Sequence, residues 1–74
     1  MSKLRPARSA QVAKVLERLG FVLIRQSGSH AVYRHEDGRW TTVPLHGGKD
    51  LGKGLLRKIL KDAGLSVEDF EGLR

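Results

Sequence analysis

The chain has 74 residues and no cysteine, and 14 Lys and Arg against 8 Asp and Glu give it a net charge of +6. This length allows one small domain and excludes folds built on a large parallel sheet, such as dinucleotide-binding and kinase folds. Without cysteine there is no disulfide and no thiolate zinc site, so stability depends on an apolar core. The longest apolar run, residues 21–24, is too short to cross a bilayer, and the N-terminus lacks the apolar stretch of a secretory signal. We therefore expect a cytoplasmic protein.

The positive charge is concentrated in one part of the chain. Residues 1–61 carry a net charge of +9, and residues 62–74 carry −3. A basic body with a separate acidic end is typical of a domain that binds a polyanion. Charge and size together favour nucleic-acid contact over the simpler interpretation that the charge only keeps a small protein in solution.

The first elements expected along the chain are a basic arm and a helix. Residues 1–8 contain Pro6 and show no apolar periodicity, which is typical of a frayed, flexible arm outside the domain. A helix follows from its candidate N-cap Ser9 to Gly20, where a left-handed glycine would end it. Four apolar residues at helical spacing form its buried stripe. They are Val12, Val15, Leu16 and Leu19.

Three β-strands are expected next, because runs of β-branched and aromatic residues alternate with turn residues. The strands are expected at residues 21–26, 30–34 and 39–45. Ser27-Gly28-Ser29 and Glu36-Asp37-Gly38 supply the two connecting turns. Pro44 has no N–H to donate, so it marks the end of the third strand or an exposed edge.

A second helix is expected over residues 54–63, ended by Gly64, and residues 66–69 resemble a helix-start box that places Phe70 on the core. The apolar face of the second helix consists of Leu55, Leu56, Ile59, Leu60 and Ala63. The opposite face carries Arg57, Lys58 and Lys61. This order predicts an α+β domain over residues 9–74, with both helices on one face of a three-stranded antiparallel sheet and the other face in solvent.

The glycine-rich, basic segment 46–53 resembles a phosphate-binding P-loop. The spacing from Gly47 to Lys53 matches the first seven positions of that motif, but Gly54 stands where a hydroxyl should hold Mg²⁺. A P-loop also needs a parallel sheet, which three antiparallel strands do not supply. The pattern therefore argues against nucleotide hydrolysis. Lys49 and Lys53, just before a helix, are still expected either to contact a backbone phosphate or to form a solvated connection.

Three histidines, His30, His35 and His46, are candidates for chemistry. A zinc site is not expected, because there is no cysteine and His30 and His35 fall on opposite faces of one strand. Alternation aligns His30 with Val32 and Arg34. A histidine that titrates near neutral pH can transfer the proton of an RNA 2′-hydroxyl or of the leaving group. Spacing alone, however, favours a turn or surface histidine over a catalytic one.

Trp40 and Tyr33 are large aromatic residues in the predicted strands. The face of Trp40 is suited to stacking on an unpaired base. A domain this small needs its few aromatic residues inside, so packing in the core or on a sheet face is the favoured prediction for both.

Five blocks of the chain resemble the HicA toxin family, small proteins of bacterial toxin–antitoxin pairs that cleave messenger RNA. The blocks are Leu19-Gly20-Phe21, Arg25-Gln26-Ser27-Gly28-Ser29-His30, Tyr33-Arg34-His35, Thr42-Val43-Pro44-Leu45-His46 and residues 54–61. They occur in the family's order and spacing and cover roughly residues 9–70. The Gly-Ser-His core alone is a weak signal, whereas the ordered set is specific.

The resemblance implies a fold like the double-stranded RNA-binding domain, in the order α-β-β-β-α. It implies an endoribonuclease that cleaves messenger RNA independently of the ribosome, with His30 as the catalytic residue and a HicB-type antitoxin as protein partner. We expect no cofactor and no metal ion, because RNA carries its own nucleophile in the 2′-hydroxyl, and products that end in 2′,3′-cyclic phosphates. The free toxin is expected to be a monomer without membrane contact.

Seven residues are candidates for contact with the RNA. They are Arg25, Ser29, Lys49, Lys53, Arg57, Lys58 and Lys61. Arg25, Lys49 or Lys53 would stabilise the charge of the transition state. The basic face of the second helix would contact phosphates, an acidic antitoxin or only solvent. Two other functions stay open: a non-catalytic RNA-binding module of the same fold, and an adaptor whose basic surface binds only an acidic protein.

Overall fold

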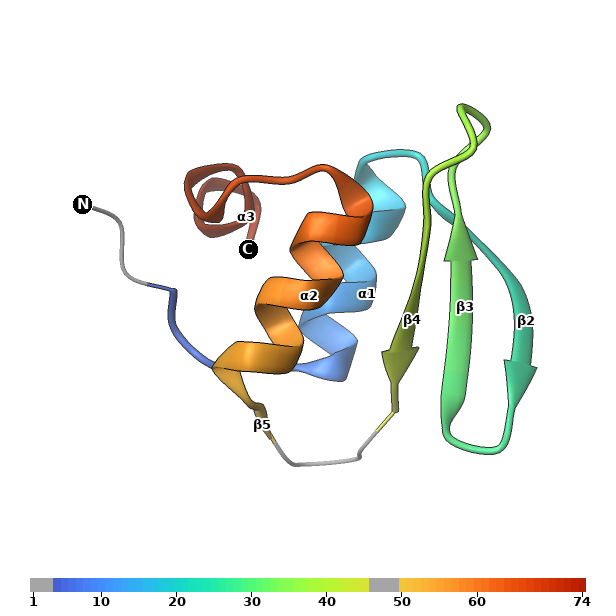
Figure 1. Ribbon diagram of the computed structural model, residues 1–74, viewed down its shortest axis with the longest axis horizontal. Coiled ribbons are helices and arrows are strands. Elements are labelled where there is room, and N and C mark those ends of the chain that lie inside the picture. Colours follow the sequence, from blue (N-terminus) through green and yellow to red (C-terminus); the bar gives the residue numbers. More distant parts are fainter. Residues whose placement is uncertain (1–3, 46–49) are drawn as a thin grey trace.

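Helices and sheet form two layers in the computed structural model, which describes residues 4–45 and 50–74 (Figure 1). The elements in chain order are β1 (Ala7–Arg8), α1 (Ser9–Arg18), β2 (Val22–Ser27), β3 (His30–Arg34), β4 (Trp40–Pro44), β5 (Asp50–Leu51), α2 (Lys53–Ala63) and α3 (Val67–Leu73). The α+β class and the order of helix, three strands and helix are confirmed. β1 and β5, which no pattern in the sequence predicted, pair with each other in a separate two-stranded sheet.

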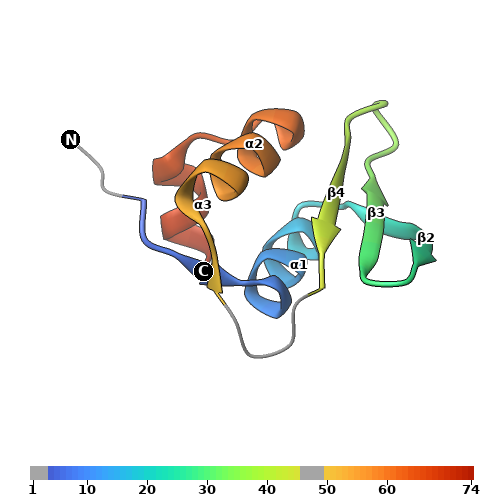
Figure 2. The same cartoon turned by 60° about the horizontal axis from the view of Figure 1, so that its bottom comes forward.

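β2, β3 and β4 form an antiparallel sheet with β3 in the middle. Alternate residues of β3 and β4 are buried on the side of the helices, as a half-covered sheet requires. They are Ala31, Tyr33, Thr41 and Val43. Both helices lie on this side of the sheet (Figures 1 and 2), which confirms their predicted placement. The opposite side, which we call the outer face, is formed by Val22, Arg25, Ser27, His30, Val32, Arg34, Trp40, Thr42 and Pro44.

β2 is the edge strand farthest from the helices (Figure 1). Both α1 and α2 contact β4, at the other edge of the sheet. All of β2 is therefore exposed, including Val22 at 62%, Leu23 at 43% and Ile24 at 55%. Phe21, one residue earlier, is only 2% exposed. The apolar character of this run thus does not indicate burial, because no second layer covers its strand.

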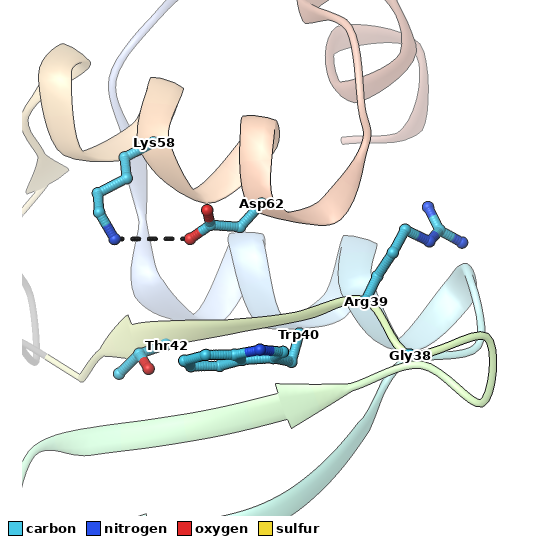
Figure 3. Close-up of a pocket in the computed structure, with 6 residues that line it drawn as sticks. All are labelled: Gly38, Arg39, Trp40, Thr42, Lys58 and Asp62. Atoms are coloured by element: carbon cyan, nitrogen blue, oxygen red, sulfur yellow. Dashed lines mark ion pairs between the residues drawn. The ribbon is translucent and has the colours of Figure 1, made fainter.

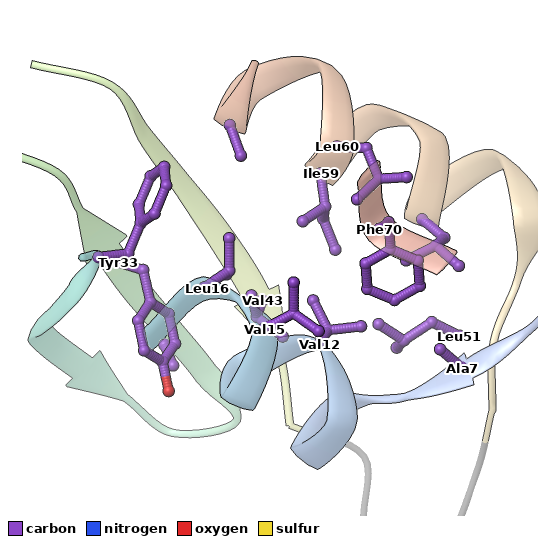
Figure 4. Packing of buried hydrophobic residues seen from close by; sticks show 14 of the residues in the cluster. Ala7, Val12, Val15, Leu16, Tyr33, Val43, Leu51, Ile59, Leu60 and Phe70 are labelled. Carbon is purple, nitrogen blue, oxygen red and sulfur yellow. The ribbon is translucent and has the colours of Figure 1, made fainter. Parts of the chain in front are cut away.

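The core lies between the helices and the inner side of β3 and β4 (Figure 4). The helices contribute Val12, Val15, Leu16, Leu56, Ile59, Leu60, Ala63 and Phe70. Leu19 is only partly buried and Leu55 is 38% exposed, so each lies at the border of its predicted stripe. Among the described residues, no helix has the length and apolar character needed to span a membrane.

Four residues were predicted to cap or end helices, and three of these predictions are confirmed. Gly20 and Gly64 have φ of +96° and +72°, the conformation expected of glycines that end helices. Ser66 and Asp69 form the expected capping box at the start of α3. Ser9 is not the N-cap of α1, so that prediction is wrong: Arg8 holds the position without a side-chain cap bond. The pairing of β1 with β5 keeps Arg8 extended, and the helix begins directly after it.

The structure places residues 4–8 within the packed domain. Leu4 is 3% exposed and Ala7 is 1% exposed, and both belong to the core. Ala7–Arg8 also pair with Asp50–Leu51. Residues 4–8 therefore do not belong to a flexible arm, contrary to the prediction. Residues 1–3 of the predicted arm lie outside the part of the chain that the structure describes.

Glu71 in α3 joins the two ends of the chain. Arg5 donates to it from its backbone N at 3.2 Å and from its guanidinium at 2.8 Å, and Arg74 Nη1 donates to it at 3.0 Å. The hydrogen bonds from Arg5, followed by those from Arg74, lower the pKa of Glu71 from 4.5 to about 2. The N-terminal segment is thus held to α3 by an ionised carboxylate.

We expect Glu71→Gln to reduce the loss of stability in acid. Because the folded-state pKa lies below the unfolded value, ionised Glu71 stabilises the fold above pH 4.5, and this contribution is lost as the pH falls through about 2. Thermal unfolding midpoints measured from pH ~5 to ~2 should fall more steeply for the wild type than for Glu71→Gln. Glu68→Gln, an exposed position of the same helix, is the control and should follow the wild type. Equal slopes for the wild type and Glu71→Gln would contradict this role.

Candidate active site

His30 is the first residue of β3 and lies on the outer face of the sheet. It pairs with Ser27 on one side and with Pro44 on the other. The residue is exposed, and its side chain forms no hydrogen bond or ion pair with any residue in 4–45 or 50–74. The imidazole is therefore open to a ligand that approaches the outer face.

Gly28 and Ser29 form the two-residue turn that leads into His30. Gly28 has φ of +57°, and a glycine at the first turn position is what a type II′ hairpin turn needs. A Cβ on Gly28 would meet no atom within 4 Å, so the backbone conformation rather than lack of space requires glycine. The Ser29 carbonyl accepts a hydrogen bond from the backbone N of Leu45, which ties the turn to the end of β4.

Gly28→Ala is expected to lower the free energy of unfolding by about 1–2 kcal/mol, because the left-handed conformation strains an L side chain. Chemical denaturation measures this difference. Gly54→Ala is a matched control, since Gly54 lies in α2 without positive φ and without atoms near its Cβ position. That change should raise stability by up to about 1 kcal/mol. An unchanged stability in Gly28→Ala would disprove the turn assignment.

Arg25 and Arg34 make the outer face basic around His30. Arg25 pairs with Val32, two residues along β3 from His30, and Arg34 ends the same strand. Both arginines are exposed, and neither forms an ion pair with a residue that the structure describes. Strands β2, β3 and β4 contain no Asp or Glu. The outer face therefore offers an anion two unpaired guanidinium groups.

The predicted RNA contacts fall into separate groups. Arg25 and Ser29 belong to the same hairpin as His30. Four others are exposed on α2, in the helix layer: Lys53, Arg57, Lys58 and Lys61. Lys49 and His46 lie outside the described residues. No hydrogen bond or ion pair within the described ranges links the basic residues of α2 to His30.

His35, unlike His30, makes contacts with other residues of the fold. Its Nδ1 accepts a hydrogen bond from the backbone N of Asp37 at 3.1 Å, and its ring packs edge-on against Phe21 with the centroids 5.2 Å apart. Only 18% of the side chain is exposed. His35 thus stabilises the turn between β3 and β4. Within the described ranges, no three His, Asp or Glu side chains come together in a way that could hold a metal ion.

The two aromatic residues of the strands have different environments. Tyr33 is 5% exposed, as predicted, and its burial raises the pKa of its hydroxyl. Trp40 is 59% exposed on the outer face, so of the two predicted positions it takes the sheet face and not the core. Thr41 and Val43 take the inward positions of β4, and the alternation of a strand then turns Trp40 outward. That alternation was the sequence signal for its exposure.

A cleft of about 420 Å³ opens beside Trp40, between β4 and α2 (Figure 3). It is lined by Gly38, Arg39, Trp40, Thr42, Lys58 and Asp62. Lys58 Nζ lies 3.6 Å from Asp62 Oδ2, which also accepts a hydrogen bond from Thr41 Oγ1 at 3.2 Å. The Arg39 guanidinium points away from the cleft and is bonded to other groups. The cleft could not be predicted from the sequence, because it lies between a strand and a helix that are distant in sequence.

Comparison with known proteins places these features in a family. No curated protein matches the chain. The sequence model of one family, described as the HicA toxin of bacterial toxin-antitoxin, matches residues 9–65. The matched region contains α1, the whole sheet β2-β3-β4 and α2, and with them His30. It covers most of the chain, so the chain belongs to the HicA toxin family.

Proposed function

We propose that this toxin cleaves messenger RNA and that His30 is its catalytic residue. Membership of the HicA family supplies the toxin role. The observation that supports the proposal most directly is the setting of His30: it is exposed, forms no bond with a described residue, and shares the outer face with Arg25 and Arg34. A polyanion that lies on this face brings its phosphates to an available imidazole.

In the proposed mechanism RNA supplies the nucleophile. His30 accepts the proton of a 2′-hydroxyl, whose oxygen forms a bond to the adjacent phosphorus. The bond from phosphorus to the 5′-oxygen breaks, and that oxygen takes a proton from solvent. Arg25 stabilises the negative charge that accumulates on the phosphoryl oxygens. The products are a 2′,3′-cyclic phosphate and a 5′-hydroxyl, and neither a metal ion nor a ribosome takes part.

The family also implies an antitoxin partner. We propose that this partner is a HicB-type antitoxin, that it blocks access to the outer face, and that the free toxin acts as a monomer in the cytoplasm, where messenger RNA is translated. Because the outer face is basic, an acidic inhibitor surface would compete with RNA for it. Lys53, Arg57 and Lys61 on α2 offer such a partner a second basic surface.

The test is cleavage of a labelled RNA by the purified toxin, with and without EDTA and without ribosomes, followed by analysis of the product ends. We expect cleavage in EDTA and cyclic phosphate ends. Loss of activity in EDTA together with 5′-phosphate ends would overturn the mechanism. Salt-sensitive RNA binding without cleavage would indicate a non-catalytic RNA-binding module. Tight antitoxin binding without RNA affinity at low salt would indicate an adaptor.

A further inference from the structure

Trp40 is a large aromatic side chain without a place in the core. It is the only tryptophan of the chain, and it is 59% exposed. A tryptophan contributes most to stability when buried, so this one adds little to folding for its size. An exposed aromatic face with cationic neighbours is instead the usual platform for an unpaired nucleic-acid base. Arg34 lies directly across the strand pair from Trp40 and supplies such a cation.

The cleft beside Trp40 has the groups that would hold a base. The indole lies along β4 next to Thr42, and Lys58 and Asp62 reach down from α2 toward the strand (Figure 3). The Thr42 hydroxyl forms no hydrogen bond with a described residue. Asp62 binds Thr41 and Lys58 through one carboxylate oxygen, which leaves the other to accept from a base N–H. The cleft thus combines an aromatic plane, a donor, an acceptor and a cation.

Trp40 and His30 belong to the same face of the sheet. Trp40 pairs with Arg34, at the end of β3 opposite to His30. Arg34 lies four residue steps along β3 from His30, a distance of about 13 Å. Arg25 and Val32 lie between them on the outer face. A single RNA strand on this face can therefore reach the cleft and the imidazole at the same time.

We propose that the cleft between β4 and α2 binds one unpaired RNA base, stacked on Trp40, a short way along the strand from the phosphate that His30 attacks. This inference rests on the proposed function and adds to it the recognition of single-stranded substrate. The basic groups Arg34 and Lys58 would attract RNA and an acidic protein alike. The indole plane with the Thr42 hydroxyl and the Asp62 carboxylate beside it favours RNA, because a nucleobase combines a flat ring with a hydrogen-bonding edge. Stacking needs an unpaired base, so a duplex cannot use the cleft.

The experiment uses His30→Ala protein, which keeps RNA intact during titration, and the fluorescence of its single tryptophan. We expect an unstructured RNA oligonucleotide to quench the fluorescence, and a duplex of the same sequence to leave it unchanged. Because the next two variants lack the tryptophan, their affinities are compared with that of the parent by the fluorescence anisotropy of a dye-labelled RNA. Adding Trp40→Ala should weaken single-strand binding by about 5- to 150-fold, and Trp40→Phe should retain most of the affinity. Leu55→Ala, an exposed apolar position of α2 outside the cleft, is the control and should bind as its parent does.

Two results would overturn the proposal. The first is RNA binding without a change in fluorescence, together with unchanged affinity in the Trp40→Ala protein. The second is a loss of antitoxin binding, but not of RNA binding, in that variant, which would make the cleft a protein contact. Failure of the proposed function is a separate result: the wild type would not cleave RNA, whereas single-stranded RNA would still quench Trp40.

Discussion

The His30→Ala protein is expected to cleave RNA about 10²–10⁴-fold more slowly than the wild type, the usual contribution of one general acid–base group. Its thermal unfolding midpoint should stay the same, because the exposed His30 side chain forms no hydrogen bond within the described residues. Cleavage rates of a labelled RNA and thermal melts of the two proteins measure both effects. Induced expression should show growth arrest and loss of RNA integrity with the wild type only.

His35→Ala is the matched control for this prediction. The change removes the hydrogen bond to Asp37 and the ring contact with Phe21. We therefore expect lower stability, but cleavage at temperatures where the protein is folded. A fully active His30→Ala protein would remove His30 from the mechanism. Equal loss of activity in both variants, without loss of the fold, would point to the general basic surface rather than to one catalytic histidine.

The second large effect is expected from Phe70→Ala, which should lower the free energy of unfolding by about 3–5 kcal/mol. Phe70 is 0% exposed in α3, and Arg74 lies over its ring at 5.2 Å from the centroid. A domain of this size has a total stability of about 4–11 kcal/mol, so the change removes a large share of it. Part of the protein should then be unfolded at growth temperature.

Chemical denaturation of the purified proteins measures this loss. Leu55→Ala is the control, because it also truncates an apolar side chain, but one that is 38% exposed. Its effect should stay within about 1 kcal/mol. Similar stabilities for Phe70→Ala and Leu55→Ala would show that α3 does not complete the core. Since α3 lies beyond the residues matched by the family, the experiment also tests whether the domain needs its C-terminal helix.

Local signals predicted most of the secondary structure. Gly20 and Gly64 end α1 and α2 with positive φ, and the capping box of Ser66 and Asp69 begins α3. Such features depend on residues within one turn of each other, so the sequence carries them directly. Ser9 shows the limit of this rule. A cap motif was present, but the pairing of β1 with the distant β5 set the start of the helix one residue earlier.

The candidate site was only partly predictable. The period of a β-strand placed His30 with Val32 and Arg34, and the structure has them on one face. Spacing did not separate a catalytic histidine from a surface one, so the proposal that His30 is catalytic depends on the family resemblance. The cleft at Trp40 was missed, because two of its residues come from α2 and only packing brings them to β4.

The sequence by itself determined a small, basic α+β domain, the approximate limits of its helices and strands, and its membership of the HicA family. The tertiary structure decided which side chains are buried and which are exposed. It buried Leu4, exposed Ile24 and Trp40, and brought Arg5 to Glu71 across 66 positions of sequence. The physical reason is that hydrophobic pattern and turn chemistry act over a few residues. Exposure and charge pairing depend instead on which layer covers which strand, and here the helices pack on β4 and leave the edge strand β2 exposed.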